Sequence, residues 1–212
     1  CEGDTVSFDT SMIALGSSTI LLSSQIEITK SLVVKGLYSA TDSVIISGTG
    51  TNRIFKVDLD TSTKKTIVFD SLILINGRAT NNDGAGIHLT NTEKFTLTNS
   101  VIRGNGVIRY FWLTNFNRGG GIYCIADTLI LSNNKFHKNN AWEKSIGAGL
   151  YAKSKFVVID DCIFSENGSG TLGNNYGGGI YLSSSDSAII SNCRFDNNIA
   201  GYGGGIACDS TS

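Results

Sequence analysis

The sequence predicts an all-β solenoid, in which short strands coil around one axis and each coil buries its inner face against its neighbours. A glycine followed by an aliphatic residue recurs five times. A second segment alternates with this glycine step; it begins at Asn or Asp, continues through an aliphatic or aromatic residue, and ends in Asn. Proline is absent and glycine occurs 25 times, as suits inner strands that cannot lose a hydrogen-bond donor.

The two repeated segments keep their internal offsets while the stretches between them vary in length. The glycine step occurs at Gly86-Ile87, Gly121-Ile122, Gly149-Leu150, Gly179-Ile180 and Gly205-Ile206. The second segment spans residues 70–76, 99–105, 133–139, 161–167 and 192–198. Apolar and polar residues alternate after each glycine step, which is the period of a strand with one buried face. Each pair of segments therefore predicts one coil.

The chain is expected to form one domain over residues 1–212, as a piece of a longer protein. Residues 1–58 hold short strand candidates broken by Ser, Thr and Gly, and they predict an N-terminal cap with divergent coils. Such a cap protects the open edge of the first coil. Regular coils are expected over residues 66–212.

Composition limits the partners of this chain. The net charge of −1 argues against nucleic acid and anionic membranes, because both usually require a basic patch. No apolar run approaches the roughly 20 residues of a membrane-spanning helix.

Aligned repeats predict columns of like residues inside the solenoid. The three expected inner columns are Val68, Leu97, Leu131, Ile159 and Ile190; Ile73, Ile102, Phe136, Phe164 and Phe195; and Ser71, Ser100, Asn134, Cys162 and Cys193. Neighbours in a column should lie about 4.8 Å apart, the spacing between paired strands. Cys162 and Cys193 are expected to stay reduced, because stacked side chains aim their sulfurs the same way.

A further column of asparagines is expected to form a hydrogen-bonded ladder, since each amide carries donors and an acceptor. Its members are Asn76, Asn105, Asn139, Asn167 and Asn198. Asn167-Gly168-Ser169 is a glycosylation sequon, but a glycan could not fit there if the Asn167 side chain points inward.

The candidate ligand-binding residues are aromatic. Tyr123, Tyr151 and Tyr181 follow three successive glycine steps, and His88 and Ala207 hold the same place in other coils. The three tyrosines are expected to form an outward, exposed column that binds a protein surface or a sugar ring; the alternative is that they only stiffen the scaffold. The longest insert adds Tyr110, Phe111 and Trp112, and loops on a rigid scaffold often carry function.

No catalytic, metal or cofactor site is expected. A glycosidase needs two facing carboxylates, and the sequence offers only scattered acids such as Asp160, Asp161 and Asp186. His88 and His137 occupy different places in their coils and lack a second ligand at metal spacing. The five cysteines include no Cys-x-x-Cys pair.

These motifs resemble those of right-handed parallel β-helix proteins of the pectin-lyase-like class, and most of all the repeats of chlamydial polymorphic outer membrane proteins. That family pairs Gly-Gly-Ala-Ile with Phe-x-x-Asn. Similar motifs here are Gly119 to Ile122, Gly177 to Ile180 and Gly203 to Ile206, and Phe136 to Asn139, Phe164 to Asn167 and Phe195 to Asn198. The resemblance, over residues 66–208, implies a single-stranded right-handed parallel β-helix.

The resemblance also implies a secreted or cell-surface stalk with a structural or adhesive role. Its partner would be a protein or glycan of a host or neighbouring cell. The alternative is a carbohydrate-active enzyme, a polysaccharide lyase or glycoside hydrolase, of the same class. Facing carboxylates in a cleft would favour the enzyme, whereas outer aromatics without paired acids favour binding.

Overall fold

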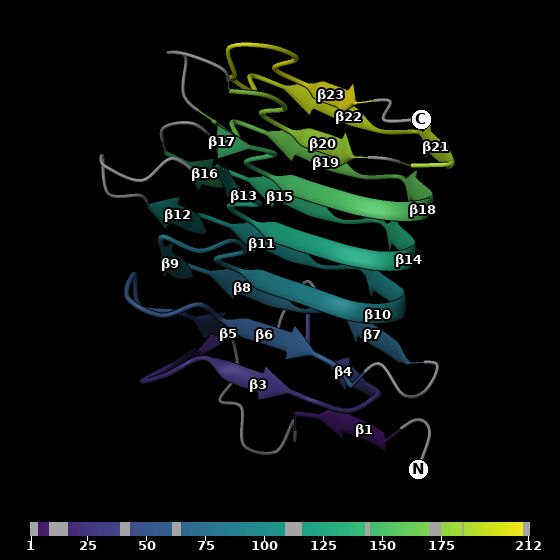
Figure 1. The fold of residues 1–212 in the computed structure, drawn as a ribbon. Helices are drawn as coiled ribbons and strands as arrows, with labels where there is room; N and C mark the ends of the chain where they lie inside the picture. The colour runs from purple at the N-terminus through teal and green to yellow at the C-terminus, as the bar shows by residue number, and fades with distance from the viewer. Residues whose placement is uncertain are drawn as a thin grey trace.

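The computed structural model describes residues 4–8, 17–38, 43–60, 65–108, 116–142, 145–169, 175–183 and 185–209. The chain winds as a parallel β-helix, with its N-terminus at one end of the stack and its C-terminus at the other (Figure 1). Every strand pair is parallel and joins neighbouring coils, which confirms the predicted solenoid. No helix in this part of the chain is long and apolar enough to cross a membrane.

Two large sheets and two small ones run along the axis. Sheet A contains β1 (Asp4–Ser7), β3 (Ile26–Ile28), β4 (Leu32–Lys35), β6 (Phe55–Asp58), β7 (Thr66–Asp70), β10 (Ile87–Thr98), β14 (Ile122–Ser132), β18 (Leu150–Asp160), β20 (Ile180–Ser183), β21 (Ser187–Ser191) and β23 (Ile206–Asp209). Sheet B contains β2 (Ser17–Leu21), β5 (Ser43–Ser47), β8 (Ile73–Ile75), β11 (Val101–Arg103), β15 (Lys135–His137), β19 (Ile163–Ser165) and β22 (Arg194–Asp196). Sheet C contains β9 (Arg78–Thr80), β12 (Gly106–Ile108) and β16 (Asn140–Ala141), and sheet D contains β13 (Asn117–Arg118) and β17 (Ser145–Ile146).

The strands before residue 66 take part in the same sheets. β4 pairs with β7, β5 with β8, and β6 with β10, all in parallel. β1, β2 and β3 pair in turn with β4, β5 and β6. The coiled stack therefore begins well before the first glycine step.

A left-handed residue turns the chain from sheet A into sheet B. Asn99, Asn133, Asp161 and Asn192 all adopt φ between 50° and 53° at this corner. Asparagine and aspartate tolerate this conformation better than other non-glycine residues. The repeated Asn or Asp in the sequence therefore marks a turn.

The asparagine ladder, formed by Asn105, Asn139, Asn167 and Asn198, lines the next corner inside the coil. The Asn105 Nδ2 donates to Asn139 Oδ1 at 3.1 Å, and the same bond links the next two pairs at 3.0 and 2.9 Å. Each Oδ1 also accepts a backbone N–H of the preceding coil. Asn167 is fully buried, so its sequon is closed to a glycan in the folded chain.

The inner columns are confirmed from residue 97 onward. Ile102, Phe136 and Phe164 are fully buried, and the Phe164 ring stacks on Phe136 at 4.5 Å and on Phe195 at 5.2 Å. In the last coil Phe195 is only partly buried.

The expected register of the coil around residue 70 was wrong by one residue. Ser71 holds the left-handed position, with φ of 56°, rather than Asp70. Leu74 pairs with Ile102, so Leu74 takes the inner place expected for Ile73. Gly77, not Asn76, stands in the ladder, since its N–H donates to Asn105 Oδ1 at 2.7 Å.

The same slip moves two more columns. Phe69 pairs with Leu97, so it replaces Val68 inside, and Leu72 replaces Ser71 because its N–H donates to the Ser100 hydroxyl. The physical reason is that Asp70 ends strand β7 and accepts hydrogen bonds from Thr98 and Asn99. Two adjacent turn-forming residues made both registers plausible in the sequence.

Cysteine thiols lie free in the described residues, Cys162 and Cys193 among them. The Cys162 and Cys193 thiols each donate to the carbonyl two residues earlier, at 3.2 and 3.0 Å. Burial raises the pKa of Cys162 to about 12.

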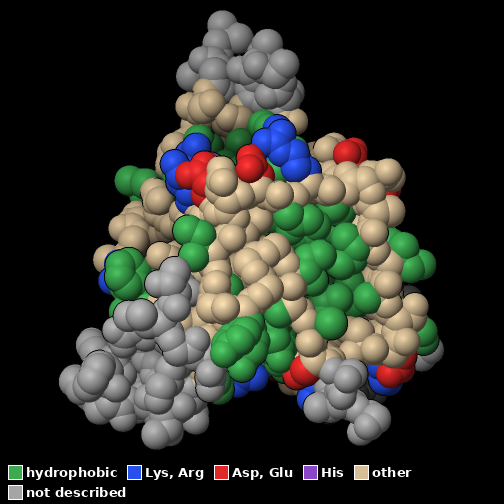
Figure 2. Space-filling model, turned by 90° about the horizontal axis from the view of Figure 1, so that it is seen from above, with side chains coloured by type: hydrophobic (Ala, Val, Ile, Leu, Met, Phe, Trp, Pro, Cys, Tyr) green, Lys and Arg blue, Asp and Glu red, His purple; other side chains and the backbone are tan. Residues whose placement is uncertain are grey.

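The C-terminal end of the stack is apolar. Figure 2, which looks down on this end, shows hydrophobic side chains spread across it. Ile189, Ile199, Tyr202 and Ile206 of the last coils are exposed.

Candidate functional site

The glycine step builds an outer corner between sheets D and A. Gly119 and Gly147 adopt φ of 63° and 66°, a region open to glycine at little cost. A Cβ on Gly121 would lie 2.5 Å from the Gly149 carbonyl oxygen, so this place must also be glycine. The tight turn brings the outward side chains of sheet D against those of sheet A.

The tyrosine column (Tyr123, Tyr151 and Tyr181) lies on the sheet A side of this corner. Tyr123 and Tyr151 stack at 5.2 Å, and Tyr151 and Tyr181 at 5.7 Å. The His88 ring continues the stack at 5.0 Å from Tyr123. The predicted column therefore exists as an outer feature of consecutive coils.

The expectation that this column is exposed was wrong for two of its members. Tyr123 and Tyr151 are only 6% and 5% exposed. The Arg118 guanidinium lies 5.5 Å from the Tyr123 ring centroid and 5.4 Å from that of Tyr151, so together with the stacked neighbouring rings it covers them. Burial raises the pKa of Tyr123 to about 12. Tyr181 is half-buried, and its hydroxyl donates to Asp209 at 2.9 Å.

Asp83 holds Arg118 over the column. Its carboxylate accepts the Arg118 backbone N–H at 2.7 Å and lies 3.5 Å from Nε. Burial raises the pKa of Asp83, and the positive charge of Arg118 partly offsets this rise. Arg53 donates to the Asp83 carbonyl at 2.9 Å from the other side. The repeats carry no signal for this clamp, because Arg53, Asp83 and Arg118 lie in the variable stretches between them.

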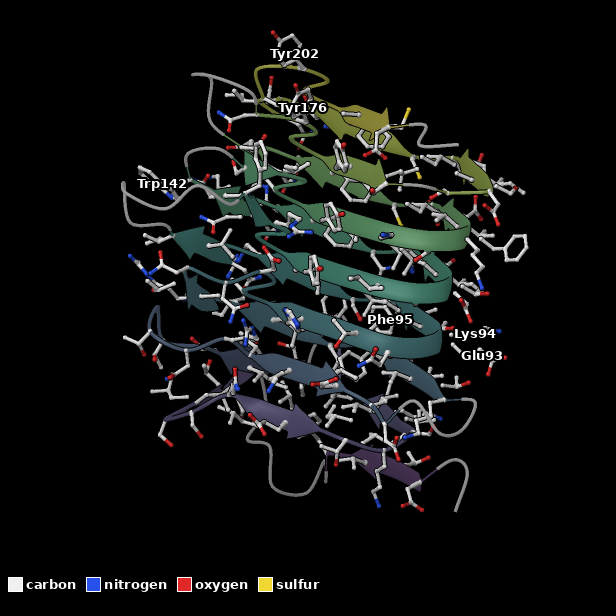
Figure 3. The ribbon with its side chains drawn as sticks, in the orientation of Figure 1. Glu93, Lys94, Phe95, Trp142, Tyr176 and Tyr202 are labelled. Carbon is white, nitrogen blue, oxygen red and sulfur yellow. The ribbon has the colours of Figure 1, made fainter. Side chains whose placement is uncertain are left out.

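Sheet D continues toward the C-terminus as a row of larger side chains. Arg118 pairs with Ile146, and isolated bridges extend the row to Tyr176 and Tyr202. Tyr176 and Tyr202 stack at 5.2 Å and lie over the uppermost coils (Figure 3). Tyr110, Phe111 and Trp112, the other expected site residues, lie outside the described residues.

The described residues also form a groove of about 500 Å³ over β9, β12 and β16, which continues past β9 to Leu21, Ser47, Thr49 and Gly50 of the preceding coils. We call it the glycine trench. β12 runs between β9 and β16. Its first residue, Gly106, faces outward and pairs with Arg78 of β9 and with Asn140 of β16. Gly104, at the preceding corner, also lines the groove. The middle strand therefore presents bare backbone at Gly106, whereas its last residue, Ile108, carries an outward side chain that lines the groove beside Trp142.

The walls of the trench are polar, cationic and aromatic. Arg78 and Asn76 line one side, and Lys138 and Trp142 line the other. Trp142 is 58% exposed and projects at the left margin of the ribbon (Figure 3). The inward neighbours Ala79, Val107 and Ala141 form a small buried cluster that fixes the floor.

Sequence reasoning overlooked the trench, although a signal was present. Gly104 and Gly106 flank the ladder residue Asn105, so the places on either side of it lack a side chain. Trp142 follows the next ladder residue, Asn139, by three positions. A search for missing outward side chains beside an exposed aromatic residue would have found it.

The trench suits binding. Among the described residues that line it, none is Asp or Glu, so no pair of carboxylates faces it there, as glycoside hydrolysis requires. Nor does any group of three or more His, Cys, Asp or Glu with metal-site geometry occur in the described ranges.

Comparison with known proteins agrees with this architecture. The family described as "Right handed beta helix region" matches residues 44–212. No match was found among curated proteins or solved structures.

Proposed function

This chain belongs to the right-handed β-helix family, and from that premise we propose that it is a secreted or cell-surface scaffold with an adhesive role. Its ligand is a glycan of a host or neighbouring cell, held in the glycine trench. The proposal is supported by a rigid stack whose buried ladder leaves its outer surface free to carry a binding site.

The observation that carries the proposal is the exposed Trp142 at one end of a floor whose backbone is bare at Gly104 and Gly106. An indole offers a flat apolar face with a polar N–H, which matches the two-sided character of a sugar ring. A side chain 58% exposed also contributes little to the core. Recognition explains its place better than packing.

The proposed contact lies in the trench rather than at the tyrosine column. A ligand cannot reach the ring faces of Tyr123 and Tyr151 while Arg118 covers them. Tyr181 and the exposed Tyr202 remain accessible at the C-terminal end of the corner. A partner protein could use that end, but the groove of about 500 Å³ lies elsewhere, in the trench.

Replacing Trp142 with alanine tests the proposal. Binding of the variant to a glycan array and to cultured host cells should fall at least tenfold, while the unfolding temperature stays close to that of the parent chain. Phe156→Ala is the matched control, because Phe156 is 53% exposed on strand β18 of sheet A and lies outside the trench lining. Equal binding by the two variants would contradict the proposal.

The proposed cell-surface location of the protein is tested separately. Cells that make the full-length protein should bind an antibody against this β-helix without permeabilisation. Labelling that requires permeabilised cells would overturn the surface assignment.

A further inference from the structure

The ionisable side chains that line the glycine trench in the described residues are all basic. Arg78 and Lys138 are its only ionisable lining residues among those the structure describes. Lys138 Nζ lies 3.5 Å from the Glu166 carboxylate, on the next coil and outside the lining. No carboxylate of the described residues lies within ion-pair distance of Arg78. Within the described part of the chain, the trench therefore holds a guanidinium without an ion-pair partner and an ammonium that Glu166 partly neutralises.

The two cations stand on opposite walls. Arg78 and Asn140 both pair with Gly106, so they lie two strand spacings apart, about 10 Å. Lys138 precedes Asn140 on the same wall, and Trp142 follows it. A ligand lying across Gly106 would meet a cation on each side and an indole at one end.

The floor allows such a ligand to come close. A Cβ placed on Gly106 would have its nearest neighbour, the Asn140 carbonyl oxygen, at 3.6 Å, an ordinary contact. Gly106 is therefore not required by the fold, since φ is not positive there and a side chain would fit. The absence of a side chain at Gly106 leaves space in which a flat ring can contact the backbone.

We propose that the glycine trench binds an acidic oligosaccharide, whose rings carry carboxylates. This inference rests on the proposed glycan-binding function and deepens it. Arg78 binds a ring carboxylate with its planar, forked donors, and Lys138 attracts a second one. Trp142 stacks on a ring face, and the amides of Asn76 and Asn140 donate to and accept from the sugar hydroxyls.

Other polyanions fit the trench less well. Nucleic-acid binding draws its affinity from many phosphate contacts along a basic track. This chain has a net charge of −1, and the trench has two cations. A single hollow with one indole suits a few sugar units.

The experiment uses a uronate oligosaccharide, and the same oligosaccharide with its carboxylates reduced to alcohols, as matched probes. Titration calorimetry should show the acidic probe binding at least tenfold more tightly than the reduced one, and more weakly as salt is raised. Arg78→Gln should lower affinity for the acidic probe by about tenfold to a hundredfold, the range for losing a charged hydrogen bond. It should leave affinity for the reduced probe unchanged.

Gly106→Gln fills the trench and should abolish binding of both probes. Ser187→Gln is its control, because Ser187 is exposed on strand β21 of sheet A and lies outside the trench lining. The control should bind as the parent chain does, and all variants should keep the parent unfolding temperature.

Two outcomes separate this inference from the function it rests on. Equal affinity for the acidic and reduced probes, both lost in Trp142→Ala, would overturn the acidic ligand and keep glycan binding. A single-stranded oligonucleotide that binds more tightly than the acidic probe would also overturn it. Glycan and cell binding unchanged in both Trp142→Ala and Gly106→Gln would overturn the two proposals together.

Discussion

The tyrosine column and the glycine trench place aromatic residues on the outside of the same coils, with opposite results. At the column, consecutive coils all present a ring, and Arg118 lies across Tyr123 and Tyr151. At the trench, the preceding coil presents bare backbone at Gly104 and Gly106. The indole of Trp142 lies beside Ile108 of that coil and stays 58% exposed. The neighbouring coil, rather than the residue itself, decides whether an outer aromatic residue is covered.

The two regions also differ in whether their arginine has an ion-pair partner. Arg118 at the column is held by Asp83, whose side chain is only 16% exposed. Arg78 at the trench has no such partner within the described part of the chain. A paired cation closes a surface and stabilises it, whereas an unpaired cation beside a hollow is available to a ligand. The column therefore belongs to the scaffold and the trench to recognition.

The largest expected effect comes from a substitution in the buried core that supports both regions. Phe164→Ala should lower the free energy of unfolding by about 3–5 kcal/mol, because the buried ring leaves a cavity between stacked neighbours that cannot collapse. Urea unfolding followed by circular dichroism measures the change. Phe156→Ala, on the outer surface, should cost far less. Equal costs for the two variants would show that the inner column does not carry the stability.

A smaller effect should follow from opening the column. Arg118→Ala should lower the free energy of unfolding by about 1–2 kcal/mol, since the variant loses two cation–π contacts and the partner of Asp83. Tyr123 and Tyr151 should then become reactive toward nitration, which mass spectrometry of peptides detects.

Arg103→Ala is the control for this prediction, because Arg103 is exposed on strand β11 and covers no tyrosine. Its nitration pattern should match the parent chain. Tyr123 and Tyr151 that stay unreactive in Arg118→Ala would show that something other than the guanidinium protects them.

The smallest effect should come from increasing the net positive charge at the trench. Glu166→Gln removes the carboxylate that partly neutralises Lys138, so affinity for a uronate oligosaccharide should rise about two- to fivefold, as a surface ion pair allows. Titration calorimetry at low salt measures it. Glu27→Gln makes the same change in net charge at a pair on sheet A. An equal gain in both variants would mean that net charge, not Lys138, is responsible.

Register shows where reading the sequence was sufficient and where it was not. From residue 97 onward one Asn or Asp per coil marked the turn, and the inner columns followed correctly. Around Asp70 and Ser71 two turn-forming residues stood side by side, and hydrogen bonds from Thr98 and Asn99 selected the second for the corner. Pairing between coils, which lies outside any local segment, made that choice.

The coil could be predicted from the amino-acid sequence alone. Glycine steps, inward Asn and alternating apolar residues are local requirements of turns and strands, so they can be read without knowing what lies above or below. Which outer side chains are covered became clear from the packing of successive coils. Exposure of Tyr123 depends on Arg118 across the corner, and exposure of Trp142 depends on Ile108, which lies beside it in the preceding coil. Both contacts form between residues that are distant in sequence, because stacking brings successive coils within one strand spacing of each other.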